Sequence, residues 1–357
     1  MRTRVSAVLV AALVATLVVV HPASAAGAKR YVDPIFGQVS EQHDVTYGQA
    51  VDSKGVLQQL KLDVYSPVGD TATDRGLLIW AHGSGFRYGD KSDIGPLKEY
   101  VKRGWVAISI EYRMRPELPA NAFVGIVTDP TSVPTAQAAA RDAQHDMQAA
   151  IRWARVHAST LGISPSRIAA GGMSAGAIMA LMVAFNPNDP GDSGNPGVSS
   201  SVAAAISHAG AYVPYLQGGL PQAGAPPIAI YHGTNDEQVP YPTSPPGCLL
   251  TMLAGNVCEH VTFVGREHAT LGTDLAMDFL YRYVIAPTTT PSASVREADV
   301  DADNARVLAG TEHIGSLGAI VGVDVPSDPN VTVEHTVELA QYVLDALGLG
   351  TSLSFWG

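Results

Sequence analysis

Hydrophobic and polar residues alternate in some stretches of the chain, whereas other stretches are almost continuously hydrophobic. The two patterns predict two kinds of strand. Residues 45–51 and 57–65 are rich in β-forming residues, and a turn-forming stretch from Asp52 to Gly55 separates them. This pattern predicts an antiparallel hairpin with one solvated face. Short, almost continuously apolar runs are instead typical of parallel strands buried on both faces. Four such runs follow at 76–81, 105–110, 202–206 and 228–231.

The helical pattern is strongest in residues 135–158, an alanine-rich stretch without Gly or Pro. Met147, Ile151 and Ala154 recur there at helical spacing. Strands that alternate with helices predict an α/β fold with a mostly parallel central sheet, helices on both faces and the hairpin at its start. Shorter helices are expected at 97–103, 177–183, 249–253 and 274–285, and a further strand at 260–264.

Residues 113–134 are expected to form a long loop, because they contain four prolines together with several apolar residues. An apolar loop of this length is typical of a segment that lines or covers a site.

The first 25 residues predict a secretory signal peptide. Arg2 and Arg4 precede a nearly unbroken apolar run over residues 5–20, and Ala23-Ser24-Ala25 forms a small-x-small cleavage site. An uncleaved N-terminal anchor is the alternative, although the run is short for a membrane span. No later stretch is apolar enough to cross a bilayer, so we expect a secreted, extracellular mature chain without a membrane span.

A stretch rich in Pro, Thr and Ser begins at Pro287 and predicts a linker. After it we expect one clear helix, at 333–347, and a possible strand at 319–325. This last segment could be a lid, an extension of the sheet, a surface attachment or a loosely folded tail. The chain therefore divides into four parts: a signal peptide (1–25), a large domain (26–287), a linker (288–295) and a C-terminal segment of open role (296–357).

Charge and cysteine content exclude several classes of partner. The formal net charge is −11 and there is no basic cluster, so we expect neither nucleic acid nor anionic lipid as a partner. Cys248 and Cys258 lie ten positions apart, which in an exported protein predicts a local disulfide. A metal site there lacks partners, since only His260 is near and the usual ligand spacing is missing.

The acidic stretch Asp299–Asn304 mimics the start of a calcium loop, but its twelfth position is Gly310 rather than a bidentate acid. A solvated acidic turn is the favoured interpretation, and we expect no metal and no cofactor.

A candidate nucleophile lies in the pentapeptide from Gly172 to Gly176, between an apolar strand and a helix-like run. A tight strand-to-helix turn places its central residue in strained backbone geometry, so the residues two positions away on either side must lack bulk. The hydroxyl of Ser174 would then project above the sheet, with the N–H of Ala175 pointing into the same space. A plain glycine-rich turn is the alternative, but the strand and helix on either side favour a nucleophile.

A serine nucleophile needs a base within reach and an acid that orients the base, and with this kind of turn they follow in the order Ser, Asp or Glu, His. Asp236 follows a buried strand and is the predicted acid, with an Asx-turn role and Glu237 as alternatives. His268 follows the strand at 260–264 and is the predicted base. The other histidines fit less well by order or position: His208, His232, His260, His313 and His335.

Backbone donors for an oxyanion are expected in His82-Gly83-Ser84-Gly85, where small residues after a buried strand leave amides free to face a ligand. The alternative is a simple β-turn.

Together these motifs resemble α/β-hydrolases of the esterase and lipase type, near the hormone-sensitive-lipase-like and feruloyl-esterase-like carboxylesterases. The resemblance implies the α/β-hydrolase fold, with Ser174 as nucleophile, His268 as base and Asp236 as orienting acid. It also implies that Gly83, Ser84 and Ala175 supply the oxyanion-hole amides. The matching motifs cover about residues 45–285 and are Leu62–Pro67, His82–Phe86, Glu111–Arg113, Ser164–Ile168, Gly172–Gly176, His232–Asp236 with Val239–Pro240, and His268.

Two positions depart from the family pattern: Ser84 and Glu267 stand where glycine is usual. The expected function is a secreted serine hydrolase that cleaves small-molecule or polymer-derived carboxylic esters through an acyl-enzyme. A serine peptidase or amidase on the same fold is one alternative. A hydrolase-like protein that only binds a partner is another.

Overall fold

The structure, a computed structural model, describes residues 29–119, 133–212, 221–287 and 311–314. Their centre is one sheet whose described strands follow the order β1-β2-β4-β3-β5-β6-β7-β8-β9. Strands β3 to β8 run parallel to one another, whereas β1 pairs antiparallel with β2, β2 with β4, and β9 with β8. The strands are β1 (Val39–Val51), β2 (Leu57–Pro67), β3 (Arg75–Ala81), β4 (Val106–Ile110), β5 (Ile163–Met173), β6 (Ala204–His208), β7 (Ile228–Gly233), β8 (Cys258–Phe263) and β9 (Thr311–Ile314).

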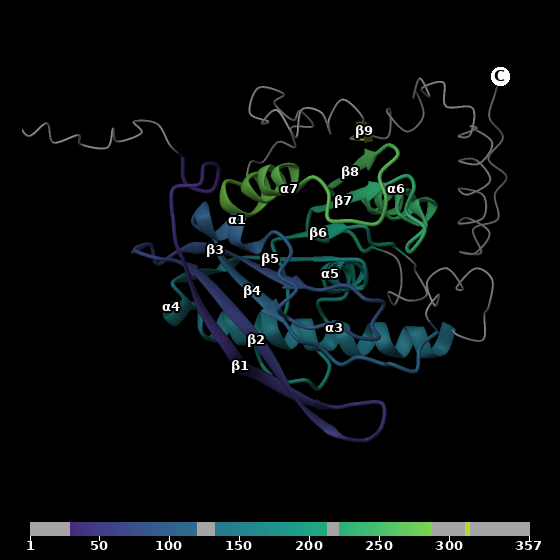
Figure 1. Cartoon of the computed structure of the whole chain (residues 1–357), viewed down its shortest axis with the longest axis horizontal. Coiled ribbons are helices and arrows are strands. Elements are labelled where there is room, and N and C mark those ends of the chain that lie inside the picture. The colour runs from purple at the N-terminus through teal and green to yellow at the C-terminus, as the bar shows by residue number, and fades with distance from the viewer. Residues whose placement is uncertain (1–28, 120–132, 213–220, 288–310, 315–357) are drawn as a thin grey trace, which may run out of the picture.

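Helices cover both faces of this sheet (Figure 1), which confirms the predicted fold class. Buried residues of α3 and α5 belong to one hydrophobic cluster, and those of α1 and α7 belong to a second cluster across the sheet. The α-helices in the described ranges are α1 (Leu97–Lys102), α3 (Val133–Val156), α4 (Ala158–Leu161), α5 (Ala175–Phe185), α6 (Pro245–Leu253) and α7 (Thr273–Leu280), the last continued by a π-helical turn at Tyr281–Ile285.

The unbroken apolar run of β3 has a simple physical cause. Leu77 and Ile79 pack into the cluster that contains α3 and α5, whereas Leu78 and Trp80 pack into the cluster that contains α1 and α7. Successive side chains of a strand point to opposite faces, so a strand between two helical layers needs apolar residues at every position. All seven residues of β3 are buried accordingly.

Some element boundaries differ from the sequence prediction. β6 begins at Ala204 rather than at residue 202, and α6 begins at Pro245, because proline is well tolerated in the first turn of a helix. α3 includes Val133 and Pro134, which the sequence pattern assigned to a loop. The rest of that loop, residues 120–132, lies outside the described residues.

The C-terminal segment contributes an element that the sequence pattern did not predict. β9 pairs antiparallel with β8 and extends the sheet at its edge. Several predicted segments lie outside the described residues: the signal peptide (1–25), the linker (288–295), the acidic stretch at 299–304, the strand at 319–325 and the helix at 333–347. The predicted disulfide between Cys248 and Cys258 is present and joins α6 to β8.

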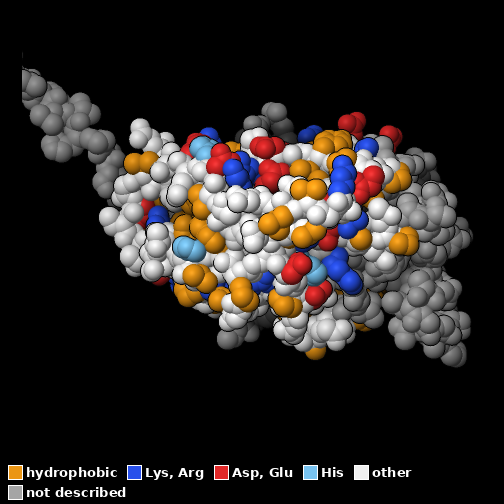
Figure 2. All heavy atoms as spheres, turned by 90° about the horizontal axis from the view of Figure 1, so that it is seen from below, with side chains coloured by type: hydrophobic (Ala, Val, Ile, Leu, Met, Phe, Trp, Pro, Cys, Tyr) orange, Lys and Arg blue, Asp and Glu red, His pale blue; other side chains and the backbone are white. Residues whose placement is uncertain are grey.

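The face of the molecule in Figure 2 carries acidic and basic side chains next to one another, with hydrophobic side chains scattered between them. In the described part of the chain, no helix is both long enough and apolar enough to cross a membrane.

Candidate active site

The three residues predicted as a triad follow three parallel strands of one sheet. Ser174 directly follows β5, Asp236 follows β7 after a short turn, and His268 lies in the loop after β8. Because the carboxyl ends of parallel strands meet at one edge of the sheet, all three residues start from that edge.

The backbone of Ser174 has the geometry of a strained turn, with φ 57° and ψ −119°. Its N–H donates to the carbonyl oxygen of His208 on β6, at 2.9 Å. A Cβ atom added to Gly172 would lie 2.4 Å from a backbone atom of Gly176, and one added to Gly176 would lie 2.1 Å from the carbonyl oxygen of Ala81. The turn therefore requires glycine at both positions, which explains why the pentapeptide motif begins and ends with glycine.

Asp236 and His268 form a buried pair. Nδ1 of His268 lies 2.7 Å from Oδ2 of Asp236, while Oδ1 accepts hydrogen bonds from the N–H groups of Gln238 and Val239 at 2.9 and 2.8 Å. Although burial acts in the opposite direction, hydrogen bonds from His232, His268 and Val239 hold the pKa of Asp236 well below its usual range. The carboxylate is therefore ionised at neutral pH, whereas the rival acid Glu237 is exposed.

A second histidine, which the order of motifs had set aside, also contacts this carboxylate. Nε2 of His232 lies 3.1 Å from Oδ2 of Asp236 and 2.9 Å from the carbonyl oxygen of Val239. His232 is fully buried at the end of β7. In the sequence, His232 lies four residues before Asp236, where a strand passes into a turn. This spacing could have indicated a contact, but the expected order Ser, Asp, His places the base after the acid and so gives no reason to choose His232.

The loop that carries His268 is fastened to the turn that carries Asp236. The N–H of Asn235 donates to the carbonyl oxygen of Arg266 at 2.9 Å, and the N–H of Gly265 donates to the Thr234 hydroxyl at 2.8 Å. Glu267, which replaces the usual glycine, is exposed, so its side chain is accommodated in solvent.

His208 links Ser174 to the far side of the same loop. Its backbone carbonyl holds the N–H of Ser174, and its ring Nδ1 lies 2.7 Å from the carbonyl oxygen of Leu271, three residues after His268. His208 is buried, and burial lowers its pKa to about 4, so the ring is neutral at neutral pH and Nδ1 carries the proton that it donates.

The predicted oxyanion stretch lies directly against Ser174. A Cβ atom on Gly83 would come within 3.1 Å of Cβ of Ser174 and 3.8 Å of its Oγ. Ser84 has a positive φ of 78°, a conformation that favours glycine and explains why glycine is usual there. Ala175 is the first residue of α5, so its N–H has no acceptor within the helix.

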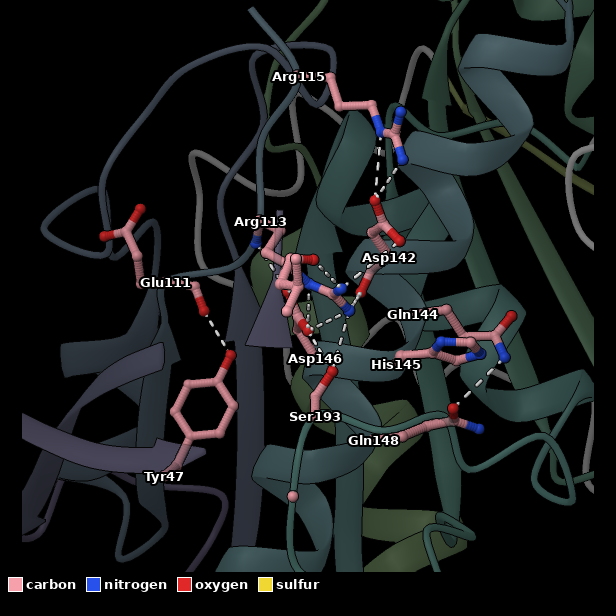
Figure 3. A network of polar contacts seen from close by, with 12 residues as sticks. Tyr47, Glu111, Arg113, Arg115, Asp142, Gln144, His145, Asp146, Gln148 and Ser193 are labelled. Atoms are coloured by element: carbon pink, nitrogen blue, oxygen red, sulfur yellow. Dashed lines mark hydrogen bonds and ion pairs between the residues drawn. The ribbon is translucent and has the colours of Figure 1, made fainter. Parts of the chain in front are cut away.

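The segment after β4 is anchored beside this stretch by a buried ion pair (Figure 3). The carboxylate of Asp146, on α3, accepts hydrogen bonds from the guanidinium and the backbone N–H of Arg113 and from the hydroxyl of Ser193. The side chain of Asp146 is completely buried. Across the described residues, no group of three or more His, Cys, Asp and Glu side chains is arranged to hold a metal ion.

A mostly parallel sheet with helices on both faces, a serine on a strand-to-helix turn and an Asp–His pair at the same edge define an α/β-hydrolase. Residues 62–211 match the BD-FAE family model, which describes feruloyl-esterase-like α/β-hydrolases. The matched segment contains the oxyanion stretch and Ser174 and ends before Asp236. The fold of the chain is thus that of an α/β-hydrolase, and its matched segment is similar to enzymes of the esterase and lipase type.

Individual proteins that the chain resembles are lipases and esterases. The chain is 35% identical over 115 residues to Lipase 2 of Moraxella sp. (strain TA144), a match that covers 32% of this chain and 22% of Lipase 2. Among solved structures, it is similar to the esterase Est2 of Thermogutta terrifontis with propionate bound, at 26% identity and a TM-score of 0.52, covering 70% of this chain and 96% of Est2. The butyrate-bound form of Est2 matches with the same identity and TM-score, covering 67% of this chain and 95% of Est2.

Proposed function

We propose that this chain is a secreted serine hydrolase that cleaves carboxylic esters through Ser174, His268 and Asp236. The observation that carries the proposal is the 2.7 Å contact between Nδ1 of His268 and the buried, ionised Asp236, on the sheet edge where the strained turn presents Ser174. An acid and a base held this way are what a serine needs to lose its proton at neutral pH.

The chemistry follows from the tautomer of the base. With Nδ1–H donated to Asp236, Nε2 of His268 is the basic nitrogen and accepts the hydroxyl proton as Oγ of Ser174 attacks the ester carbonyl carbon. The resulting oxyanion is stabilised by the N–H groups of Gly83, Ser84 and Ala175.

Collapse of this intermediate breaks the bond to the alcohol, which leaves with the proton held by His268. The acyl group stays on Ser174. Water, deprotonated by the same imidazole, then attacks the acyl-enzyme and releases the carboxylic acid, which restores the serine hydroxyl.

Short acyl esters are the substrates we propose to try first, because the similar esterase from Thermogutta terrifontis has been observed with propionate and with butyrate bound. Such acyl groups occur on small molecules and on polymers. Both sources therefore remain within the proposed substrate class.

The test compares hydrolysis of p-nitrophenyl acetate and butyrate by the wild-type protein and by Ser174→Ala. The variant should lose at least about 10⁴-fold in kcat, because the nucleophile is removed. Ser166→Ala is a matched control, since Ser166 is an exposed serine on the same strand and should keep full activity. Unchanged activity in Ser174→Ala would overturn the assignment.

Two further assays separate the alternatives. Peptide anilides assayed in parallel should be cleaved far more slowly than the esters, and the reverse order would indicate an amidase. A fluorophosphonate probe should label Ser174, and an unlabelled, inactive protein would indicate a binding role.

Secretion is tested by expressing residues 1–357 in a host that exports proteins. The exported product should begin at Ala26, as read by N-terminal sequencing. Retention of an intact N-terminus in the membrane fraction would instead support an N-terminal anchor.

A further inference from the structure

One tyrosine hydroxyl contacts both backbone carbonyls of the predicted oxyanion stretch. The hydroxyl of Tyr112 lies 3.0 Å from the carbonyl oxygen of His82 and 2.9 Å from that of Gly83. The Tyr112 ring stacks on the His82 ring, with a centroid separation of 4.5 Å, and packs edge-on against Phe86. Its side chain is therefore held on two sides in a buried environment.

These two carbonyls belong to the peptide groups that carry two of the predicted oxyanion donors. The carbonyl of His82 shares a peptide plane with the N–H of Gly83, and the carbonyl of Gly83 shares one with the N–H of Ser84. The described peptide bonds are all trans, and in a trans peptide the N–H points opposite to the C=O. Because both carbonyls converge on the Tyr112 hydroxyl, both N–H groups point away from it.

We propose that Tyr112 is a positioning residue for the oxyanion hole: its hydroxyl orients the amides of Gly83 and Ser84 toward the oxyanion that forms on Ser174. The inference rests on the proposed function, and it assigns a role to a residue outside the triad and the oxyanion amides themselves.

The hydroxyl is suited to this role because it stays a donor. Burial raises the pKa of Tyr112 well above its ordinary value, so the proton is retained at any working pH. Without that proton, two buried carbonyl oxygens would face one another with poor hydrogen bonding, and such groups are costly to leave unpaired. Nδ1 of His82 lies 3.2 Å from the carbonyl oxygen of Gly83 and offers partial support, so removing the hydroxyl should loosen the stretch without collapsing it.

Tyr112 is itself held from both sides along the chain. The residue after it, Arg113, donates its backbone N–H to buried Asp146 at 2.7 Å. The carbonyl of the residue before it, Glu111, accepts a hydrogen bond from the hydroxyl of Tyr47 at 2.5 Å (Figure 3). The position of Tyr112 is therefore set by contacts with α3 and β1. Because these contacts lie outside the oxyanion stretch, Tyr112 can support the conformation of that stretch.

Tyr112→Phe tests the proposal, because it keeps the ring stacking and removes only the hydroxyl. Its kcat should fall by about 10- to 100-fold, less than for loss of a donor, since the amides are misdirected rather than deleted. KM should change by no more than about threefold, because the hydroxyl does not touch the substrate. Binding of a trifluoromethyl ketone, which forms an oxyanion on Ser174, should weaken by the same factor as kcat.

Thr251→Val is the matched control, since it also removes a buried hydroxyl from a backbone carbonyl, that of Gly247 on α6, but leaves Tyr112 and the oxyanion stretch untouched. Its kcat and its affinity for the trifluoromethyl ketone should stay within about twofold of wild type. Titration of Ser174 with a fluorophosphonate normalises each rate to the fraction of competent sites, so partial misfolding of a variant cannot mimic the effect.

The possible outcomes distinguish the role of Tyr112 from the proposed function. Full normalised kcat and full ketone affinity in Tyr112→Phe, with an active wild type, would overturn the role of Tyr112 and leave the proposed function standing. Equal losses in both variants would also overturn it, because they would show a general effect of buried hydroxyls. A wild type that neither hydrolyses esters nor reacts with the fluorophosphonate would overturn the proposed function and this inference together.

Discussion

Nδ1 of His268 lies 2.7 Å from Oδ2 of Asp236, although 32 residues separate them in the chain. The connection from β7 through α6 to β8 returns the chain to the same sheet edge, so the loops after two adjacent parallel strands meet. A second donor, His232, reaches the same oxygen from β7. The carboxylate is thereby surrounded by donors, which keeps it ionised and fixed in place.

Asp236→Asn should lower kcat by about 10³- to 10⁴-fold, because an amide neither stabilises the imidazolium nor selects the tautomer with the proton on Nδ1. The thermal stability should change much less than the activity, since the two side chains have the same shape. Glu237→Gln is the control and should keep wild-type kcat, because Glu237 is exposed. Equal losses in the two variants would show that the order-based choice of Asp236 is wrong.

Gly233→Ala should displace the base loop. A Cβ atom at this position would lie 2.2 Å from the carbonyl oxygen of Arg266 and 3.0 Å from that of Glu267, and backbone atoms have to move to make room. A shift of about 1 Å in the base is expected to lower kcat/KM by about 100-fold. Gly37→Ala places its Cβ where no atom lies within 4 Å and should have no effect. Unimpaired catalysis in Gly233→Ala would mean that His268 tolerates movement of its loop.

Glu111→Gln should change how stability depends on pH. Burial raises the pKa of Glu111 from 4.5 to about 6. A carboxyl with a raised folded-state pKa contributes stability that is fully present below pH 4.5 and is lost as the pH rises through about 6. The amide cannot ionise, so the Tm of the variant relative to wild type should be higher at pH 8 than at pH 5. A Tm difference that is the same at both pH values would contradict the raised pKa.

Removal of the disulfide should cost stability more than activity. The bond between Cys248 and Cys258, which lie ten positions apart, closes a short loop, and the chain-entropy model assigns about 2–3 kcal/mol to such a loop. The double variant C248S/C258S should therefore unfold at lower temperature and lower denaturant concentration. Its kcat at 25 °C should remain close to wild type, since the bond joins α6 to β8 away from Ser174. An unchanged unfolding midpoint would show that α6 is held by packing alone.

Much of the site could be predicted because its signals are local. The turn around Ser174 needs glycine at two positions, whatever the rest of the fold does. Asp236 and His268 could be chosen because each follows a predicted strand in the expected order. The Cys248–Cys258 disulfide followed from short spacing in a chain expected to be exported.

Other parts of the candidate site could not be predicted from the residues next to them in the chain. The role of His208 depends on a carbonyl 63 residues later in the chain, and that of Tyr112 on carbonyls about 30 residues earlier. A backbone carbonyl looks the same in every residue, so no pattern of residue types marks it as an acceptor. β9 escaped prediction for a related reason, since an edge strand of four residues pairs through its backbone and needs no apolar pattern.

The sequence by itself determined the α/β class, the strained turn at Ser174 and the choice of Asp236 and His268 as candidate acid and base, because these follow from side-chain periodicity and from turn chemistry within a few residues. Only the tertiary structure decided that His232 shares the carboxylate of Asp236, that His208 ties Ser174 to the loop that carries His268, and that Tyr112 faces two carbonyls at once. Such contacts arise where strands distant in the chain end at the same edge, and their geometry is set by the packing of the whole sheet.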